Sequence, residues 1–179
     1  PTRFCCNSEK EVFMTFDIKI KLKDLYGFTL YHGYAGFFGK LWLIISLGAL
    51  IGFFATFGQV TTQYSLALLF VGLLFTVINP IHLYYKCAVR MKKTKEAYEK
   101  PFKYHCNKDG ILLTQGEGSI YYKWDIIFQF VNTRKAIYMM SDPIHACIIP
   151  KKQLGEKEQE FIEYIKHTVP ASVRKKGFR

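Results

Sequence analysis

The side chains best suited to hold a metal ion are two histidine–cysteine pairs in the second half of the chain. His145 and Cys147 are two residues apart and would share one face of a strand, whereas His105 and Cys106 are adjacent and would point to opposite faces. One residue of the second pair could complete a three-ligand zinc site with the first pair. Such a site needs converging ligands supported by further hydrogen bonds. Because both pairs lie in ordinary strand patterns, we expect no metal and no other cofactor.

Other catalytic signatures are missing from the sequence. It contains no G-x-S-x-G motif, no H-E-x-x-H motif and no phosphate-binding P-loop. The acidic residues that follow Pro101 fall in predicted turns or on a predicted exposed helix, not as a carboxylate pair for acid–base catalysis. We therefore expect a protein that is not an enzyme.

The longest apolar stretch, residues 41–85, contains no Asp, Glu, Lys or Arg. Residues 41–57 and 66–85 within it each reach the roughly 17–25 residues that cross the hydrocarbon core of a bilayer. A helix in a soluble core usually keeps a polar face, and neither segment has one. The stretch therefore predicts a membrane-spanning helical hairpin with a short turn at residues 59–65.

Basic residues flank this hairpin and set its expected orientation. The formal net charge is +11, and the excess is concentrated just after the second span. Lys and Arg gather on the cytoplasmic side of membrane helices, so we expect both termini there. The five cysteines, Cys5, Cys6, Cys87, Cys106 and Cys147, would then all face a compartment where thiols stay reduced. We attribute the charge to topology and to attraction of anionic lipid, not to nucleic-acid binding.

Within the hairpin, Gly48 and Gly52 form a GxxxG pattern that permits close helix packing, either with the second span or in a homodimer. Pro80 is expected to kink the second span, since proline removes a helix hydrogen bond. Cys87 lies where juxtamembrane acylation could occur.

The polar residues in the two spans that are available to line a pore are few. They are Ser46, Thr56, Thr76, Asn79 and His82.

After Pro101 the hydrophobic period changes to short alternating runs separated by turns, which predicts six strands. We expect these at residues 102–106, 111–114, 119–124, 126–131, 135–140 and 145–149. The alternating run at residues 13–23 needs sheet partners and would be a seventh strand. Gly110 is expected to take a positive φ in its turn, and even-numbered residues from Ile120 to Phe130 are expected on one face. An amphipathic helix follows at residues 156–167, with Phe161, Ile162, Ile165 and Val169 as its apolar stripe, and it ends before Pro170.

The fold class expected from these elements is a membrane α-helical hairpin plus an all-β PH-like barrel with a C-terminal capping helix. Residues 24–40 are rich in aromatic residues and predict a helix, either lying at the membrane interface or packed against the soluble module. The expected parts of the chain are a strand region (1–23), the interfacial segment (24–40), the hairpin (41–85), a basic helix extension (86–100), the barrel with its helix (101–170) and a basic tail (171–179).

At this point the chain resembles the YcxB-like family of bacterial membrane proteins. The resemblance rests on the run T-F-D-I-K-I-K-L-K-D-L at residues 15–25, the two close spans, the Asp109-Gly110 turn, Y-K-W-D-I at residues 122–126, I-I-P-K-K at residues 148–152 and the helix with Phe161. These motifs are structural, so the resemblance implies a fold and a bacterial inner-membrane location. By analogy, related membrane-tethered domains suggest a role in self-protection against bacteriocins.

We expect an interaction module for protein or anionic lipid, tethered in the membrane and serving as an accessory to a transporter or as an immunity protein. The alternative is a pore or transporter subunit that assembles through its spans. The partners expected are the bilayer and either a membrane protein or a second copy of the chain. The candidate lipid- or anion-binding residues are Arg90, Lys92, Lys93, Lys95, Arg134, Lys135, Lys151 and Lys152.

Overall fold

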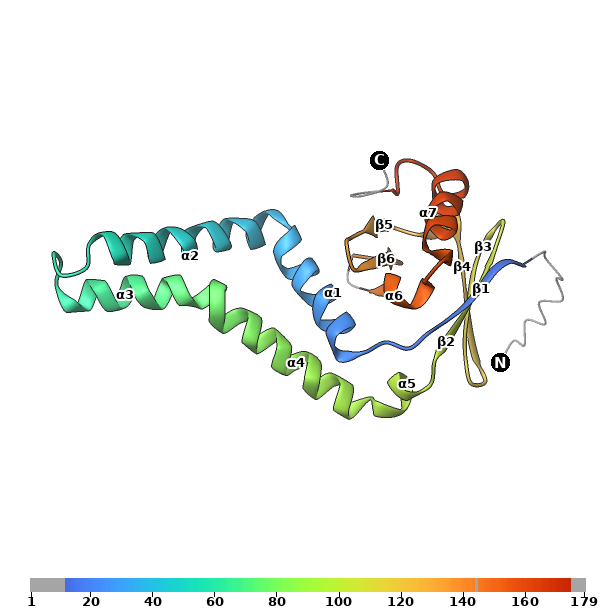
Figure 1. Ribbon diagram of the computed structural model, residues 1–179, viewed down its shortest axis with the longest axis horizontal. Helices are drawn as coiled ribbons and strands as arrows, with labels where there is room; N and C mark the ends of the chain where they lie inside the picture. Colours follow the sequence, from blue (N-terminus) through green and yellow to red (C-terminus); the bar gives the residue numbers. More distant parts are fainter. Residues whose placement is uncertain (1–11, 144, 175–179) are drawn as a thin grey trace. The chain divides into compact units, whose positions relative to one another are not determined.

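The computed structural model describes residues 12–143 and 145–174 and is drawn in Figure 1. The chain divides into a helical unit, residues 22–95, and a second unit built from the segments on either side, up to Lys21 and from Glu96 onward. We call the second one the β unit. The expectations for residues 1–11, including Cys5 and Cys6, and for residues 175–179 of the basic tail lie outside the described residues.

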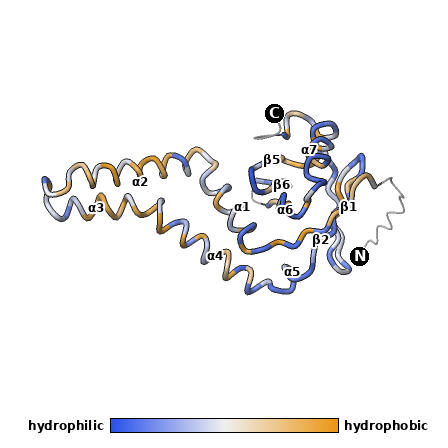
Figure 2. Tube along the Cα trace, viewed as in Figure 1, coloured by the Kyte–Doolittle hydropathy of each residue, from blue (hydrophilic) through white to orange (hydrophobic). Residues whose placement is uncertain are grey.

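The helical unit is a hairpin of two long helical segments. In the described part of the chain, two helices are long and apolar enough to cross a membrane, α2 and the 32-residue run of α3, η1 and α4. α2 has 19 residues, so it is about 28 Å long, close to the ~30 Å of a hydrocarbon core. Figure 2 shows α2 and α3 to be mainly hydrophobic. The bounds are α1 Leu22–Ala35, α2 Phe37–Ala55, α3 Thr62–Leu73, η1 Leu74–Ile78 and α4 Asn79–Lys93.

The distortion expected at Pro80 takes the form of a π-helical turn, η1, directly before it. Proline has no N–H to donate to the carbonyl of Thr76, four residues earlier, and its ring would press on that carbonyl. The main-chain N–H of Asn79 bonds instead to the carbonyl of Leu74, five residues back. The hydrogen bond therefore spans one residue more than in an α-helix, and a single π-helical turn of this kind is one of the known causes of a kink in a helix.

α1 packs along α4 within the helical unit. Leu25 is buried, the rings of Tyr26 and Tyr84 meet edge to face at 5.4 Å, and the Thr29 hydroxyl lies 3.3 Å from the Cys87 sulfur. α1 is therefore a packed helix whose partner is α4, while its expected place at the membrane interface stays a prediction. Cys87 is only 4% exposed, so the expectation of an acylation site at this thiol is not supported by its position.

The β unit contains seven strands in the described part of the chain, as the alternating pattern predicts. Val12–Ile18 pairs antiparallel with Phe102–Asn107, so the strand before the hairpin joins the sheet that follows it. The bounds are β1 Val12–Ile18, β2 Phe102–Asn107, β3 Gly110–Gln115, β4 Gly118–Lys123, β5 Gln129–Asn132, β6 Ala136–Met140 and β7 Ala146–Pro150. The short helices are α5 Lys95–Glu99, η2 Trp124–Ile126 and α6 Lys151–Leu154, and the C-terminal helix is α7 Lys157–Thr168.

The closed barrel expected from the sequence is wrong. In the described residues the strands form two open sheets, one of order β1-β2-β3-β4 and one of order β5-β6-β7. The 3-10 turn η2 separates β4 from β5, and the free edge of β5 is taken by the C-terminal segment, where the Phe130 N–H donates to the Val173 carbonyl at 2.8 Å. An edge already bonded in this way is not available to close a barrel.

The same turn overturns the expected register after Trp124. Ile126 is 61% exposed and Phe128 is exposed as well, whereas Ile127 and Phe130 are buried. Alternation holds only along a continuous strand, and three residues of 3-10 helix shift the inward positions of whatever follows. The even-numbered face predicted from Ile120 to Phe130 is therefore not one face.

One hydrophobic core joins both sheets to α7. Phe161, Ile162 and Ile165 are buried on the inner side of α7, as its amphipathic pattern predicts. Phe161 meets the ring of Phe16 edge to face at 5.3 Å, which ties the helix to β1. The first strand of the chain is thus part of the same core as its last helix.

Gly110 in the β2–β3 turn does not have the positive φ expected of it. Glycine is needed at this position because there is no room for a side chain. A Cβ placed there would clash with the Tyr122 carbonyl and lie 2.8 Å from the Tyr121 hydroxyl. The turn itself is held by the Asn107 side chain, whose oxygen accepts the Gly110 N–H at 2.8 Å.

Candidate functional site

A shallow groove on α4 is a strongly basic recess of the helical unit. It has a volume of about 350 Å³ and is lined by three basic, two apolar or aromatic and one hydroxyl-bearing residue, namely Lys86, Arg90, Lys93, Tyr85, Val89 and Thr94. The three basic residues are spaced at i, i+4 and i+7, so they lie on one side of the helix. We call this feature the α4 groove.

The local sequence explains why these charges gather at the end of the helix. The second long helix has no Asp, Glu, Lys or Arg before Lys86. Arg90 and Lys93 are in the last turn of α4, where cations interact favourably with the helix dipole. No acidic residue lines the groove as the structure describes it, so its charge is uniformly positive.

Only part of the predicted basic cluster on α4 belongs to the groove. Arg90 and Lys93 line it, whereas Lys92 and Lys95 are exposed elsewhere and do not. Lys86 and Tyr85 were not assigned to a site from the sequence. The signal that would have found Lys86 is its spacing of four and seven residues from Arg90 and Lys93, while Tyr85 lies four residues before Val89, another residue of the groove.

The predicted basic residues of the β unit meet at one end of the β5-β6-β7 sheet. The Lys151 N–H donates to the Lys135 carbonyl at 3.1 Å, which brings the β5–β6 turn beside the start of α6. Arg134, Lys135 and Lys152 are exposed there. Lys151 is different, because its side chain is 15% exposed and its ammonium lies 2.9 Å from a Glu158 carboxylate oxygen. Three of these four cations are therefore open to an anionic partner.

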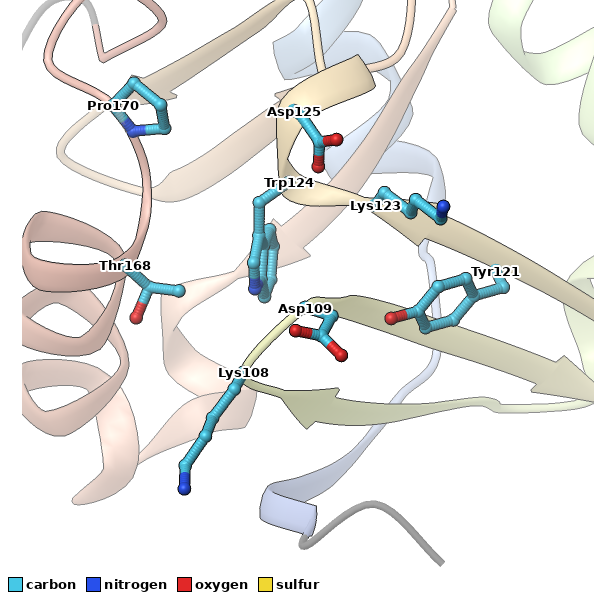
Figure 3. A pocket seen from close by; sticks show the side chains of 8 residues that line it. All are labelled: Lys108, Asp109, Tyr121, Lys123, Trp124, Asp125, Thr168 and Pro170. Atoms are coloured by element: carbon cyan, nitrogen blue, oxygen red, sulfur yellow. The ribbon is translucent and has the colours of Figure 1, made fainter. Parts of the chain in front are cut away.

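A second recess, of about 430 Å³, lies in the β unit beside the β2–β3 turn. Figure 3 shows the Trp124 indole between the turn that carries Asp109 and the end of α7. The lining mixes two lysines and two aspartates with aromatic and small side chains: Lys108, Lys123, Asp109, Asp125, Tyr121, Trp124, Thr168 and Pro170. The indole N–H of Trp124 donates to the Asn107 carbonyl at 3.0 Å, and the Tyr121 hydroxyl donates to the Asn107 side chain at 3.1 Å. The polar atoms of both rings thus support the turn.

The histidine–cysteine pairs do not converge. Cys106 is fully buried in the core, while His105 points to the other face and bonds through Nδ1 to the Thr15 hydroxyl at 3.1 Å. His145 is exposed and its Nδ1 lies 2.8 Å from an Asp142 carboxylate oxygen. Burial raises the pKa of the Cys106 thiol to about 12, as it does for Cys147, so neither is poised as a thiolate. Across residues 12–143 and 145–174, no group of three His, Cys, Asp or Glu side chains could hold a metal ion.

A polar cluster surrounds the π-helical turn of the hairpin. The Ser46 hydroxyl of α2 donates to the Val71 carbonyl at 2.7 Å and accepts the Phe75 N–H at 3.2 Å. The Tyr34 hydroxyl of α1 donates to the Phe75 carbonyl at 2.8 Å and accepts from the Asn79 side-chain amide at 2.9 Å. Side chains from α1 and α2 therefore supply hydrogen bonds to the backbone where the helical ladder changes.

Two of the remaining polar side chains in the spans bond to their own helix. The Thr76 hydroxyl donates to the Gly72 carbonyl at 2.6 Å, and the Thr56 hydroxyl donates to the Gly52 carbonyl at 2.8 Å. With the bonds of Ser46 and Asn79, most of the residues considered for a pore lining are engaged inside the hairpin. His82 is exposed.

The glycines of α2 are not the tightest point between the two long helices. A Cβ on Gly48 would meet no described atom within 4 Å, and one on Gly52 would make ordinary contact with Leu68 at 3.9 Å. A Cβ on Gly72 of α3 would instead lie 2.6 Å from the Leu50 side chain and 3.0 Å from its main-chain nitrogen. Gly72 is the close-packing residue that the sequence did not single out. A homodimer through the face with Gly48 stays a prediction.

Comparison with known proteins identifies one stretch of the β unit. Residues 106–166 match the family model described as YcxB-like protein, which confirms over this segment the resemblance indicated by the sequence. No curated protein and no solved structure matches the chain. The matched residues run from the end of β2 into α7 and include the basic residues at the end of the second sheet.

Proposed function

We propose that this chain, with its YcxB-like segment, is a membrane-anchored interaction protein without enzymatic activity. The observation that carries the proposal is the charge pattern of the second long helix, which is uncharged up to Tyr85 and exposes basic residues from Lys86 to Lys93. Such a helix suits a bilayer core followed by an anionic headgroup layer. In a bacterium, this orientation would put both termini on the cytoplasmic side of the inner membrane.

In this proposal the β unit is the recognition module. Arg134, Lys135 and Lys152 offer exposed positive charge at one end of its second sheet, and Ile126 and Phe128 offer exposed apolar surface. Exposed apolar side chains take part in protein contacts when they belong to a larger contiguous patch. Its partner would be a protein of the same membrane, such as a transporter subunit or the target of an immunity protein, or the anionic lipid surface itself.

Anchoring is tested by alkaline carbonate extraction of membranes from cells that express the full chain. We expect the protein to stay in the membrane pellet and to dissolve only with detergent, because the exposed apolar residues of α2 and α3 need hydrocarbon around them. Release of the full-length protein into the carbonate supernatant would contradict the proposed anchoring.

The role of the module is tested by affinity purification of the full chain in mild detergent, followed by mass spectrometry. A stoichiometric membrane protein that is lost in the R134Q/K135Q/K152Q variant or in an I126S/F128S variant would support the module. A defined homo-oligomer that dissociates with Gly48→Leu/Gly52→Leu would instead support the pore or transporter-subunit alternative.

A further inference from the structure

We propose that the α4 groove binds the phosphate of an anionic phospholipid, an inference that rests on the membrane anchoring proposed above. The site would be specific: one headgroup held by Lys86, Arg90 and Lys93, with Tyr85 and Val89 beneath it. It differs from a general attraction of basic residues to the membrane surface, because the other cations of this helix end lie outside it.

The chemistry of the lining matches a phosphate. Lys86 and Lys93 supply compact ammonium charges, and Arg90 supplies a planar guanidinium that can donate two parallel hydrogen bonds to phosphate oxygens. All three side chains are exposed, and the groove has no carboxylate in its lining as described. A ligand with one or two negative charges would therefore meet only attractive charges there.

The position of the groove favours a lipid over free phosphate. It begins at Tyr85, the last residue of the uncharged stretch, and the exposed rings of Tyr84 and Tyr85 are of the type that gathers at the headgroup level. Ile78, Ile81 and Tyr85 are exposed and spaced at three and four residues, so they form an apolar strip on the same helix that leads to the groove. A phosphate in the groove would have its acyl chains beside this strip.

The test is native mass spectrometry of the full chain, purified in detergent and supplied with either phosphatidylglycerol or phosphatidylcholine. We expect the wild type to retain phosphatidylglycerol preferentially. The variant K86Q/R90Q/K93Q should lose that retention by at least about tenfold, since each basic residue near an anionic lipid contributes substantially to binding. The matched control K19Q/K103Q/K166Q removes the same charge from exposed positions of the β unit to which no binding role is given, and it should retain the lipid at the wild-type level.

Each other outcome has a definite meaning. An equal loss in both variants would show general charge attraction, and no loss in the α4 variant would show that the groove is not the site; either result overturns the inference. Full displacement of the lipid by inorganic phosphate would indicate a site for the free anion and would also overturn it. The variant K86R/K93R, which preserves the charges, should bind like the wild type. Carbonate extraction of K86Q/R90Q/K93Q separates the two proposals, because the anchoring predicts that this variant stays in the membrane whether or not it binds lipid.

Discussion

The hydroxyl of Ser46 donates a 2.7 Å hydrogen bond to the main-chain carbonyl of Val71 on the facing helix. The same oxygen accepts a hydrogen bond from the Phe75 N–H. One small side chain therefore bonds both a backbone carbonyl and a backbone N–H at the point where α3 continues into the π-helical turn. Ser46 is 1% exposed. A π turn and a proline leave backbone N–H and C=O groups without their usual helical partners. Inside a bilayer these groups have no water to bond to, and a hydroxyl from a neighbouring helix is one way to supply the missing hydrogen bonds.

Ser46→Ala should destabilise the hairpin. It removes the acceptor for Phe75 and the donor to Val71, and interhelical hydrogen bonds in membranes contribute about 1 kcal/mol each or somewhat less. We expect a loss of about 1 kcal/mol in the free energy of unfolding, measured by denaturant titration in detergent micelles. The control is Thr56→Val, which removes a hydrogen bond only within α2. Equal losses of unfolding free energy in the two variants would show that the hydrogen bonds between the helices stabilise the hairpin no more than a bond within one helix does.

Gly72→Ala should separate α2 from α3. The added methyl would lie 2.6 Å from the Leu50 side chain, and overpacking of this kind costs about 1–3 kcal/mol. Gly48→Ala is the matched control, because its methyl meets no described atom within 4 Å and should leave thermal unfolding in detergent unchanged. A strong loss of stability in Gly48→Ala would reveal a partner on that face of α2, as the homodimer hypothesis requires.

Asn107→Ala should destabilise the β unit by about 1–3 kcal/mol, the cost of leaving several donors without their acceptor. The Asn107 side-chain oxygen accepts the N–H groups of Asp109 and Gly110 at 3.2 and 2.8 Å and the Tyr121 hydroxyl at 3.1 Å. Asn107→Asp keeps an oxygen at this position and should unfold close to the wild type. Chemical denaturation followed by circular dichroism compares the three proteins. An alanine variant as stable as the aspartate variant would contradict the assignment.

The buried thiol of Cys106 should make stability fall at high pH. Burial raises its pKa to about 12, whereas a thiol in the unfolded chain titrates near pH ~8.5. Below that pH both states are protonated and the contribution is fully present. As pH rises further the unfolded state loses its proton first, so the unfolding free energy drops by up to about 1.4 kcal/mol per pH unit.

The measurement for this thiol is the pH dependence of unfolding between about pH 8 and about pH 10.5, which starts just below the unfolded-state pKa of ~8.5 and stays below the folded-state pKa of about 12, compared between the wild type and Cys106→Ala. Other groups titrate in this range in both proteins, so the informative quantity is the difference between their slopes. The variant is less stable at neutral pH because it leaves a cavity, but its stability should fall less steeply. Parallel slopes would show that Cys106 does not ionise on unfolding in this range.

Local patterns in the sequence were sufficient for most of the elements. The uncharged stretch predicted the two long helices, and alternation predicted the seven strands of the β unit and the pairing of the strand before the hairpin with one after it. The apolar stripe of α7 was predicted with Phe161, Ile162 and Ile165. These properties follow from the period of hydrophobic residues along one segment, which depends on the backbone geometry of that segment alone.

The candidate site was only partly predictable. The basic cluster after the second span was visible as composition, yet Lys86 and Tyr85 belong to the groove and Lys92 does not. Lys151 was grouped with exposed cations, but Glu158 neutralises it. A side chain's charge can be read from its type, whereas its direction on a helix and its ion-pair partner depend on the assembled fold.

The sequence by itself determined which segments are apolar enough to lie in a membrane, which alternate as strands and where the basic charge is concentrated, since each of these is a sum over neighbouring residues. Only the tertiary structure decided that the sheets stay open, that the break at Pro80 is a π-helical turn, and that Gly72 marks the tight contact between the long helices. Those outcomes depend on partners far apart in the chain. Val173 bonds at the edge of β5, and Ser46 bonds to the backbone of the facing helix. No local pattern specifies which distant group will satisfy a given hydrogen bond or fill a given space.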